Sequence, residues 1–512
     1  NFKNKKKNFL FSVEFLSSKR KWNFPCIKNP TSSENEGWLR MKRMIVELIA
    51  PTWSKKTQRK RAKKAKVFKI PPLGLLDVAA VTPEDVEVVL TDENIEPIDF
   101  EKPKDLVGIT VMTSAAPRAY EIADIFRAKN IPVILGGSHV SALPEEAIQH
   151  ADSVVIGEAE GVWEKLIEDF KKYGRKGLKK FYKNENKPDL SQVPFPRWDL
   201  LGKDKYIVTK VLHATRGCPY NCSFCSVSRF FGRKVRYRPA EKIAECVEKN
   251  VGKSLSSRFF VFLDDNIMAK REYAKRLFKT LIPYRLIWMS QASVNAAYDE
   301  ELLELAAKSG CKALFVGFET ILPEALEEIG KHQNKIEFYL EAIKRVHRYG
   351  IFVEGAFIFG FDSGDKRIFE ETVRFVNKTK LDGIQYTILT PLPGTAFYDK
   401  IEKEKRFIDR DWSSYDCGHI VYQPKSMTPE ELQAGFNWAY KETYSLRSIF
   451  TRLTGIYSGG RWKDLIPLLI FNLGYRKTCK RTSKEAWNPN RVRCRAYKNL
   501  PEKYGRFPLF SR

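Results

Sequence analysis

Long hydrophobic runs are missing from this chain of 512 residues. The longest apolar stretch, residues 465–473, is about half the length that a helix needs to cross a bilayer, and it contains Pro467 and Asn472. No compact apolar segment is followed by a small-residue cleavage site, so a secretory signal is not expected. The sequence therefore predicts a protein without membrane-spanning helices, either soluble or bound peripherally to a membrane.

Cysteine is scarce as well, with nine residues in the chain. That number is too low for a disulfide scaffold in a chain of this length. Three of the cysteines, Cys218, Cys222 and Cys225, crowd into one window, and the others are scattered. Clustered thiols of this kind are typical of metal binding in a reducing compartment. We therefore expect a cytoplasmic protein, with a peripheral position on the inner membrane face as the alternative.

Acidic residues are outnumbered by basic ones, 62 to 89, which gives a formal net charge of +27. A balance this basic is found in proteins that meet nucleic acid, an anionic membrane or a phosphate-bearing ligand. It is equally typical of an ordinary solvated surface. Charge alone therefore selects none of these partners.

The chain length predicts two or three domains. Residues 1–40 are rich in Asn, Lys, Phe and Ser, lack periodicity and contain no methionine, whereas an apolar, strand-like run begins at Met44. We expect residues 1–43 to be an extension without a fold, and the functional chain to start at Met41 or Met44.

Residues 44–185 alternate between strand-like and helical patterns. The strand-like runs are residues 45–50, 86–91, 106–111, 131–135 and 153–156, and helical patterns lie at 117–129 and 144–150. Such alternation predicts an α/β domain with a parallel, doubly wound sheet of the flavodoxin or Rossmann type.

Residues 195–425 continue the alternation through six further βα units. The strand-like runs are residues 208–214, 258–263, 286–292, 313–318, 352–359 and 383–389, and helical patterns include 239–249, 299–308 and 335–348. Consecutive βα units without a second sheet predict a partial (β/α)6 barrel, with its chemistry at the carboxyl ends of the strands. Residues 426–512 are interpreted as a helical accessory region that begins at the cap-like Thr428.

The clustered cysteines directly follow the first barrel strand. Gaps of three and two residues let three thiolates on one tight loop reach three corners of an iron–sulfur cube. Three protein ligands leave one iron with an open position for a reactant. A zinc site would need a fourth ligand, and the nearest histidine, His213, falls inside the predicted strand. The pattern favours a [4Fe–4S] cluster over zinc.

This CxxxCxxC loop, preceded by Thr215, Arg216 and Gly217, resembles that of the radical S-adenosylmethionine superfamily. The resemblance implies that the open iron binds the amino and carboxylate groups of S-adenosylmethionine, and that one electron cleaves the sulfonium to give a 5′-deoxyadenosyl radical. It also implies an electron donor such as flavodoxin or ferredoxin.

Other strand ends match the same family. Asp264 and Asp265 end the second barrel strand, Gly317 and Glu319 end the fourth, and Gly360 ends the fifth. The resemblance implies that the aspartates lie near the methionine amine, that Glu319 serves the amine or the ribose, and that backbone at Gly360 approaches the adenine. Taken singly, each is more typical of strand-end structure. Together they predict a cofactor site in which Asp264 and Glu319 are the leading residues.

Two strands of residues 44–185 end in loops that contain glycine. The loop residues are Gly136, Gly137, Ser138 and His139 after one strand, and Gly157 and Glu158 after the next. Glycines at the carboxyl ends of adjacent parallel strands open a crevice for a flat or phosphate-bearing ligand. Their order ahead of the cysteine loop resembles the cobalamin-binding subclass of the superfamily, over residues 44–450. The resemblance implies that these residues bind cobalamin, and that His139 either contacts its nucleotide tail or is an ordinary histidine of the core or surface.

Two absences sharpen this resemblance. Residues 112–118 stand where cobalamin domains with a cobalt-ligating histidine carry that residue, and none is present. The resemblance therefore implies cobalt without a protein histidine ligand, its lower face covered by this loop. No cysteine lies between residues 27 and 217, so the second cluster of the tRNA-modifying methylthiotransferases cannot form there.

Three functions are open at this point. The leading one is cobalamin-dependent methylation of an unactivated carbon, by hydrogen abstraction and methyl capture. The second uses both cofactors for a rearrangement or a ring closure. The third, of another class, is a ligand sensor or nucleic-acid-binding module that would use the basic and aromatic stretch 229–238. Because that stretch directly follows the cysteine loop, it is better interpreted as a wall of the active site, and nucleic acid is not expected as a partner.

The carboxyl-terminal region bears on the substrate. Residues 412–422 and 427–431 resemble the accessory region of lipid-modifying members such as hopanoid methylases, so the expected substrate is a small molecule or a lipid. Residues 457–476 combine apolar side chains with flanking Arg and Lys, which fits an interfacial helix or, more commonly, an ordinary core helix. The acceptor carbon is left open, and no catalytic side chain is assigned.

Overall fold

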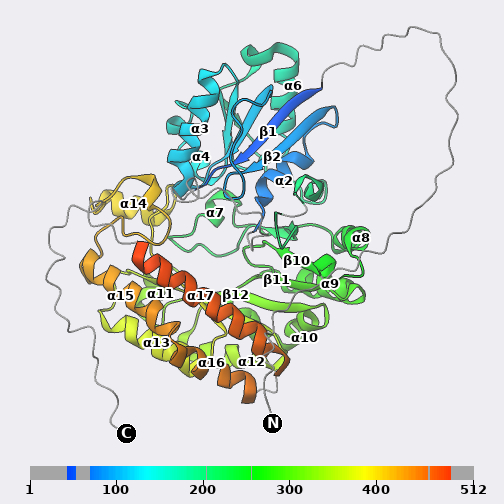
Figure 1. Cartoon of the computed structure of the whole chain (residues 1–512). Helices are drawn as coiled ribbons and strands as arrows, with labels where there is room; N and C mark the ends of the chain where they lie inside the picture. Colours follow the sequence, from blue (N-terminus) through cyan, green and yellow to red (C-terminus); the bar gives the residue numbers. More distant parts are fainter. Residues whose placement is uncertain (1–42, 53–69, 203–204, 255, 459–461, 486–512) are drawn as a thin grey trace, which may run out of the picture. The chain divides into compact units, whose positions relative to one another are not determined.

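The computed structural model describes residues 43–52, 70–202, 205–254, 256–458 and 462–485 (Figure 1). Apart from Arg43, the predicted extension lies outside the described residues. Within them, two parallel sheets follow one another along the chain, as the sequence predicts, and a group of helices follows the second sheet.

The first sheet has six parallel strands in the order β2-β1-β3-β4-β5-β6. The strands are β1 (Met44–Ala50), β2 (Val86–Asp92), β3 (Leu106–Thr110), β4 (Val133–Gly136), β5 (Ser153–Ile156) and β6 (Phe181–Lys183). Because the chain proceeds outward from β1 on both sides, the sheet is doubly wound, with a topological switch point between β1 and β3. The sequence did not predict β6, because three residues carry no readable periodicity.

Helices cover both faces of this sheet. They include α2 (Leu73–Ala80), α3 (Ala116–Ala128) and α6 (Trp163–Tyr173). Phe126 of α3 packs on one face with Val107, while Trp163 of α6 packs on the other face with Leu48. Strands buried on both sides explain why their sequences are almost continuously apolar rather than alternating.

The helix predicted at residues 144–150 is the shorter α5 (Pro144–Ala147), and a second short helix that was not predicted, α4 (Ser138–Ala142), precedes it. They meet at Leu143, whose backbone leaves the helical region with φ −130° and ψ 61°. Proline disfavours a helical conformation in the residue before it, so Pro144 ends one helix and starts the next.

The second sheet also has six parallel strands, in the order β14-β13-β12-β11-β10-β7. The strands are β7 (Lys210–Leu212), β10 (Phe259–Phe262), β11 (Ile287–Ala292), β12 (Cys311–Glu319), β13 (Phe352–Phe359) and β14 (Gly383–Ile388). No pairing joins β7 to β14 in the part of the chain that the structure describes. The arrangement is the predicted partial barrel.

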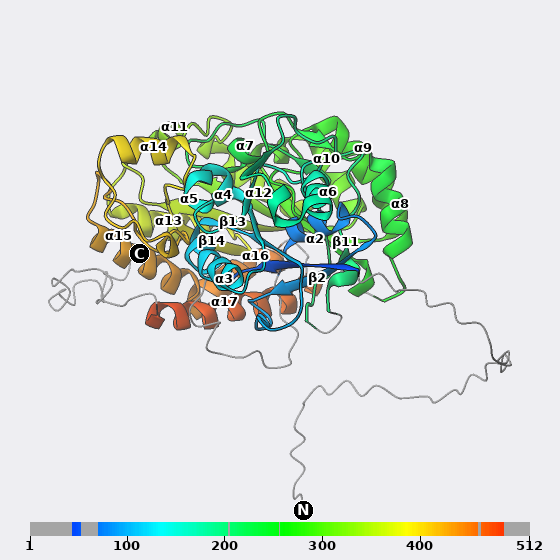
Figure 2. The ribbon, with the colours of Figure 1, turned by 90° about the horizontal axis from the view of Figure 1, so that it is seen from above.

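Amphipathic helices cover the outside of the partial barrel. They include α8 (Ala240–Asn250), α9 (Arg271–Leu281), α10 (Glu300–Lys308), α12 (Tyr339–Arg348) and α13 (Arg367–Thr379), and Figure 2 shows the first three of them in succession. In α12 the buried side chains are Tyr339, Ala342, Ile343 and Val346, which recur at the spacing of one helical face.

The first barrel strand is shorter than predicted. Instead of one strand over residues 208–214, the chain forms β7 and then β8 (Thr215–Arg216), which pairs antiparallel with β9 (Arg236–Tyr237). The break occurs because the carboxylate of Asp264 accepts hydrogen bonds from the backbone nitrogens of Ala214 and Thr215. Those nitrogens are therefore lost to the parallel ladder, and the chain turns away into the cysteine loop.

The open edge of the second sheet is covered by the carboxyl-terminal helices α15 (Pro429–Thr443), α16 (Leu446–Ser458) and α17 (Leu465–Glu485) (Figure 1). The hydroxyl of Tyr444 donates to the carbonyl of Ile384 in β14 and accepts from its nitrogen. Tyr440 does the same for Tyr386. These hydroxyls satisfy the edge strand that would otherwise be free to pair with another chain.

The helix α15 begins where the sequence predicts, at a capping box formed by Thr428 and Glu431. The helix α17 includes residues 465–476 of the segment 457–476, whose interpretation as an interfacial helix stays a prediction. Leu468 is buried against α16, whereas Ile466 and Ile470 are 68% and 64% exposed. None of the described helices is long and apolar enough to cross a membrane.

Candidate active site

The cysteine loop leaves β8 through a turn that requires glycine. Gly217 has φ +94°, and a Cβ built there would lie 2.6 Å from the carbonyl oxygen of Lys234. The next residue, Cys218, donates its backbone N–H to the carbonyl of Gly232 at 3.2 Å. The start of the loop is therefore held against the segment that returns to β9.

The middle of the loop is held from the opposite side. The nitrogen of Ser223 donates to the carbonyl of Ile329 at 2.9 Å, directly after α11 (Pro323–Glu328). The carbonyl of Ser223 in turn accepts from the nitrogen of Phe397 in α14 (Ala396–Lys403) at 2.9 Å. The structure thus fixes the loop backbone at its start and in its middle without using the thiols.

The thiols themselves are half-buried and free of disulfides. Burial raises the pKa of all three, that of Cys225 to about 12, and the charges of Cys222 and Cys218 contribute to the Cys225 value. A thiol in such surroundings ionises when a metal replaces its proton.

Among the described residues, no three His, Cys, Asp or Glu side chains converge as ligands of a single metal ion. Cluster thiolates bind different irons at separate corners of a cube, so they need not converge on one point. Three free thiols on one anchored loop are the donor set that a [4Fe–4S] cluster requires. The residues present fit that cofactor.

The two predicted aspartates at the end of β10 have different surroundings. Asp264 is fully buried, and it accepts hydrogen bonds from two backbone nitrogens and from the hydroxyl of Thr215. Asp265 has a buried Oδ2 without a hydrogen-bond partner in the described chain. Burial raises the pKa of Asp265 to about 6. The structure uses Asp264 to hold the backbone ahead of the cysteine loop, and it leaves Asp265 with an oxygen available to a ligand.

The predicted Glu319 lies at an irregularity of β12 and has φ +65°, which is rare for a residue with a side chain. Its carboxylate forms a buried ion pair with Lys331. A Cβ on Gly317 would lie 2.3 Å from the Glu319 carboxylate and 2.9 Å from Lys331 Nζ, so the glycine makes room for this pair.

Sequence reasoning missed Lys331. Burial alone would lower the pKa of this amine, but the charges of Glu319 and of a Cys222 thiolate raise it. The neighbouring Gln333 points its amide to the Cys222 sulfur at 3.9 Å. Lys331 follows a short helix and belongs to no recognisable sequence motif. Residues 331–333 come close to the cysteine loop only in the folded chain, so no signal of this contact is present in the sequence.

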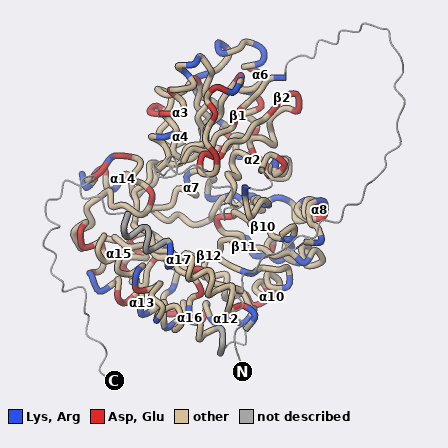
Figure 3. Tube along the Cα trace, viewed as in Figure 1, with Lys and Arg blue, Asp and Glu red and all other residues tan. Residues whose placement is uncertain are grey.

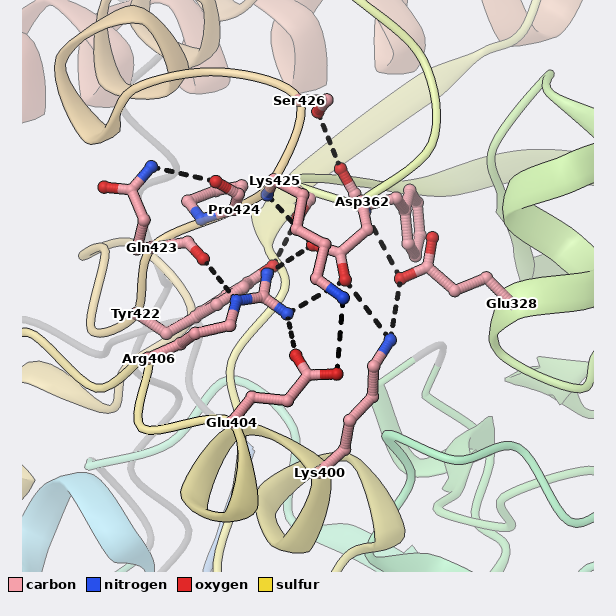
Figure 4. A network of polar contacts seen from close by, with 12 residues as sticks. Glu328, Asp362, Lys400, Glu404, Arg406, Tyr422, Gln423, Pro424, Lys425 and Ser426 are labelled. Carbon is pink, nitrogen blue, oxygen red and sulfur yellow. Dashed lines mark hydrogen bonds and ion pairs between the residues drawn. The ribbon is translucent and has the colours of Figure 1, made fainter.

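Gly360 and Asp362 follow the end of β13. Gly360 faces Leu432 and Tyr422 on the side where a Cβ would point. Asp362 lies at the centre of the network in Figure 4, where it accepts from Arg406 and Lys400. This network ties the end of β13 to α14, and the predicted contact of the Gly360 backbone with adenine stays a prediction.

The loop after β4 shows why a second glycine is needed. Gly137 has φ +108°, and a Cβ there would lie 2.8 Å from the carbonyl oxygen of Val111. At Gly136 the closest atom would be 3.7 Å away, an ordinary contact. The fold itself therefore requires Gly137, whatever ligand the loop binds, while Ser138 begins α4.

His139 is buried, with its Nε2 3.2 Å from a carboxylate oxygen of Glu146 and its ring edge-on to Trp412 at 5.1 Å between centroids. Glu146 also accepts from the indole nitrogen of Trp412 at 3.1 Å. Burial lowers the pKa of His139, and its Nδ1 has no partner within the described residues. These contacts are those of an ordinary core histidine. A contact between His139 and the nucleotide tail of cobalamin stays a prediction.

The loop after β5 contacts the strands β8 and β9, which flank the cysteine loop. Gly157 has φ +85° and open space around its Cβ direction. The next residue, Glu158, is buried and accepts from Arg216 at 2.9 Å and from Arg236 at 2.7 Å. Its carboxylate is therefore committed to the strands that flank the cysteine loop. This use of Glu158 was not foreseen, because the sequence does not reveal which charges the fold will bring together.

The loop over residues 112–118 follows β3 at the switch point. Met112 is 59% exposed, and a short 3₁₀ turn (Thr113–Ala115) leads into α3. Arg118 is held by an ion pair with Glu93 at 2.5 Å. An exposed thioether at the carboxyl edge of the sheet is compatible with the predicted cover for the lower face of cobalamin.

Two family models match the chain: the radical SAM superfamily over residues 212–376 and the B12 binding domain over residues 66–167. The bacteriochlorophyllide d C-12(1)-methyltransferase of Chlorobaculum tepidum is 31% identical over 394 residues, which cover 75% of this chain and 85% of that protein. The hopanoid C-2 methylase of Rhodopseudomonas palustris is 28% identical over 386 residues, 70% of this chain and 72% of that protein. An anaerobic magnesium-protoporphyrin IX monomethyl ester cyclase of Cereibacter sphaeroides is 26% identical over 376 residues, 68% and 61% of the two chains.

Solved structures share the fold. The cobalamin-dependent S-adenosylmethionine radical enzyme OxsB, with aqua-cobalamin bound, superimposes with a TM-score of 0.61 at 15% identity, over 85% of this chain and 72% of that chain. The methyltransferase TsrM from Kitasatospora setae, with cobalamin and a [4Fe–4S] cluster bound, gives 0.56 at 16% identity, over 78% and 88%.

Proposed function

This chain belongs to the cobalamin-binding enzymes of the radical S-adenosylmethionine superfamily, and we propose that it transfers a methyl group to an unactivated carbon of a small-molecule substrate. Its cofactors are a [4Fe–4S] cluster, S-adenosylmethionine and cobalamin. When bound, these groups supply an adenosyl radical and a transferable methyl group. The protein's own residues hold, orient and shield them.

On the barrel side, Cys218, Cys222 and Cys225 hold the cluster. Asp265 is the better ligand for the methionine amine, because its buried Oδ2 has no partner among the described residues. Glu319, held by its lysine partner, serves the amine or the ribose. The buried cation beside the cysteines also offsets part of the negative charge that the cluster brings.

On the side of the first sheet, the loops after β4 and β5 bind cobalamin. Gly136, Gly137, Ser138, His139, Gly157 and Glu158 carry this part of the proposal. The clearest support comes from Gly157, because no other atom of the described chain lies within 4 Å of the position that a Cβ would occupy there, which leaves space for a ligand. The loops stand at the carboxyl edge of a parallel sheet, where ligands of doubly wound folds bind.

One observation carries the proposal for methyl transfer. Arg216, two residues ahead of Cys218, is hydrogen-bonded to Glu158, the residue after Gly157. The cluster loop and the proposed cobalamin loop therefore adjoin each other. A carbon radical made at one cofactor can be captured at the other only if the two lie on one substrate cavity.

The substrate class follows from the relatives. The names of these enzymes indicate tetrapyrrole and hopanoid substrates, which are large, mainly apolar ring compounds. The acceptor carbon proposed here belongs to a compound of that kind. Because α17 exposes Ile466 and Ile470 beside basic residues, the proposal includes a peripheral contact with an anionic membrane that would hold such a substrate. A flavodoxin or ferredoxin would supply the electron.

The deciding experiment uses the full chain, reconstituted anaerobically with iron, sulfide and cobalamin. The protein is incubated with reductant, S-adenosylmethionine carrying a trideuterated methyl group, and a panel of tetrapyrroles and hopanoids. The proposal expects a product that carries the labelled methyl group together with 5′-deoxyadenosine. Untargeted metabolite profiling of a deletion strain, in which the unmethylated substrate accumulates, identifies the natural acceptor. Cys218→Ala is the inactive control and Cys246→Ala the active one.

Ring closure is the second candidate, because the cyclase relative covers two thirds of this chain. It predicts 5′-deoxyadenosine and a product with an unchanged number of carbons. That result would overturn methyl transfer and keep both cofactors.

A further inference from the structure

The buried charges between the two cofactor regions form a group of their own. Arg216, from β8, donates to Asp77 of α2 at 2.9 Å and to Glu158 and Glu160 of the loop after β5 at 2.9 and 2.7 Å. The arginine side chain is 4% exposed, and the three carboxylates are 2–8% exposed. We call Arg216 with these three carboxylates the Arg216 clamp.

The clamp is not a surface ion pair. Exposed pairs contribute little because water and salt screen them, whereas a buried cation that loses its partners is left uncompensated. Here one guanidinium bridges carboxylates from two separate segments of the amino-terminal region. A planar fork of five N–H donors can do this; an ammonium group cannot match the geometry.

A second arginine fixes the orientation. Arg236 lies directly opposite Arg216 in the antiparallel pair of β8 and β9, and it donates to Glu158 at 2.7 Å. The β8–β9 pair therefore binds Glu158 through two arginines. Two attachments define an angle as well as a distance.

The clamp is linked to both cofactor loops through short paths. On one side, only Gly217 separates Arg216 from Cys218, and that glycine is packed against the carbonyl of Lys234. On the other, Gly157 donates its nitrogen to the hydroxyl of Ser141 at 2.8 Å, and this hydroxyl donates to the carbonyl of Gly137 at 2.8 Å.

Apolar packing between the regions does not provide the same precision. Leu73 and Leu76 of α2 share a buried cluster with Val211 and Val261 of the barrel strands. Such contacts hold two surfaces together but are non-directional. Directional hydrogen bonds are needed to set the register between them.

We propose that Arg216 is a positioning residue, which fixes the cluster loop in orientation against the cobalamin loops through Asp77, Glu158 and Glu160. This inference rests on the assignment of the two cofactors and goes beyond it. In this proposal Arg216 acts through the loops that it holds and is assigned no contact with a reacting group. Its effect is to hold the two cofactor loops at one separation and one angle.

The test compares Arg216→Lys and the milder Glu160→Gln with the wild-type full chain, all reconstituted with cluster and cobalamin. The control is Arg175→Lys, which alters a more exposed pair with Asp152 in the same amino-terminal region. Hydrogen exchange is followed by mass spectrometry. The EPR spectrum of the reduced cluster is recorded with S-adenosylmethionine bound.

The proposal expects several-fold faster exchange over residues 214–226 in both clamp variants, a clearly larger rise than in β11, β12 and β13. It also expects a broadened, heterogeneous cluster signal in Arg216→Lys and a wild-type signal in the control. Unchanged exchange and EPR in both variants would overturn it, and so would an equal rise of exchange throughout the chain. Glu160→Gln keeps two of the three carboxylates, so it tests the idea even if Arg216→Lys does not fold. Neither readout needs methyl transfer, so failure of the proposed reaction would leave the result standing.

Discussion

Neighbouring residues of the same type can have different roles at the end of one strand. Asp264 accepts from the nitrogens of Ala214 and Thr215, whereas Asp265 keeps a buried oxygen without a partner in the described chain. We expect Asp264→Asn to lower the free energy of unfolding by about 1–3 kcal/mol, because an amide cannot accept from both nitrogens with both of its terminal atoms. We expect Asp265→Asn to leave stability almost unchanged and to weaken S-adenosylmethionine binding.

Denaturant unfolding and equilibrium binding of S-adenosylmethionine to the reconstituted protein separate these effects. If Asp264→Asn binds normally and is as stable as the wild type, the backbone role assigned to Asp264 is wrong. The sequence placed both aspartates near the cofactor, but it could not show which one the backbone would use.

The paired glycines after β4 offer a second comparison. Gly137→Ala forces a Cβ to 2.8 Å from the Val111 carbonyl at φ +108°, whereas Gly136→Ala meets only ordinary contacts. We expect Gly137→Ala to destabilise the protein by roughly 1–3 kcal/mol, and Gly136→Ala to keep its stability. Gly136 is therefore the cleaner probe of cobalamin. Weaker cobalamin binding by a stable Gly136→Ala, measured by absorption titration, would support a contact there; equal affinity would remove Gly136 from the site.

The cysteines give the most direct test of the cluster. Replacing Cys218, Cys222 or Cys225 by Ala removes one of three protein ligands, so iron and sulfide content and the EPR signal should fall to near zero. Cys246 is the matched control, since it is buried in α8 away from the strand ends. Cys246→Ala should keep a full cluster. A cluster that survives in the variant lacking all three loop cysteines would refute the assignment.

At the scale of elements, the periodicity of the sequence predicted the position of every barrel strand. It did not predict the early end of the first strand, after which the chain enters the cysteine loop. The run over residues 208–214 is apolar enough to predict one strand, yet β7 ends early because a side chain fifty residues later takes its backbone donors. Likewise, the pair of Glu319 and Lys331 depends on an irregularity in β12. Long-range hydrogen bonds of this kind leave no local signal. The motif positions could therefore be predicted, and the partners of their side chains could not.

The helix α17 contains both core residues and exposed apolar residues, and its exposed face can be tested for membrane binding. Leu468 is 5% exposed and belongs to the core, so replacing it would test folding rather than membrane binding. Ile466 and Ile470 lie one turn apart on the exposed face. We expect the full chain to co-sediment with anionic vesicles at low salt, and the double variant Ile466→Asp with Ile470→Asp to lose most of this binding.

Competing tRNA and neutral vesicles serve as controls in that experiment. Binding that tRNA removes would indicate a nucleic-acid surface instead, and no binding to anionic vesicles at low salt would end the membrane proposal. Salt dependence alone does not decide, because both kinds of contact weaken as screening increases. Figure 3 shows Lys and Arg spread along the described trace, which is compatible with an ordinary solvated surface as well.

At the scale of the whole chain, the sequence predicted two α/β regions in the correct order, and the shared core between them came only from the structure. The cluster that joins α2 to β7 and β10 includes Leu76, Tyr206 and Val211, and the Tyr206 hydroxyl donates to Asp92 at 2.8 Å. Residues scattered over so much sequence give no joint pattern. The proposed domain bounds, 44–185, 195–425 and 426–512, stay predictions. Because residues of the first two regions share one buried core, the boundary between these regions is not sharp.

The shared core and the Arg216 clamp together predict how the molecule unfolds. Cobalamin is proposed to bind the first region only, and binding at about 100 times its dissociation constant adds ~2.7 kcal/mol to the stability of whatever unfolds with that site. Because buried apolar side chains and a buried arginine join the regions, we expect one calorimetric transition that shifts as a whole when cobalamin is added. Exchange of the barrel strands β11–β13 should slow in parallel. Two transitions, of which cobalamin moves only one, would show that the regions unfold independently and that their joint core is too weak to couple them.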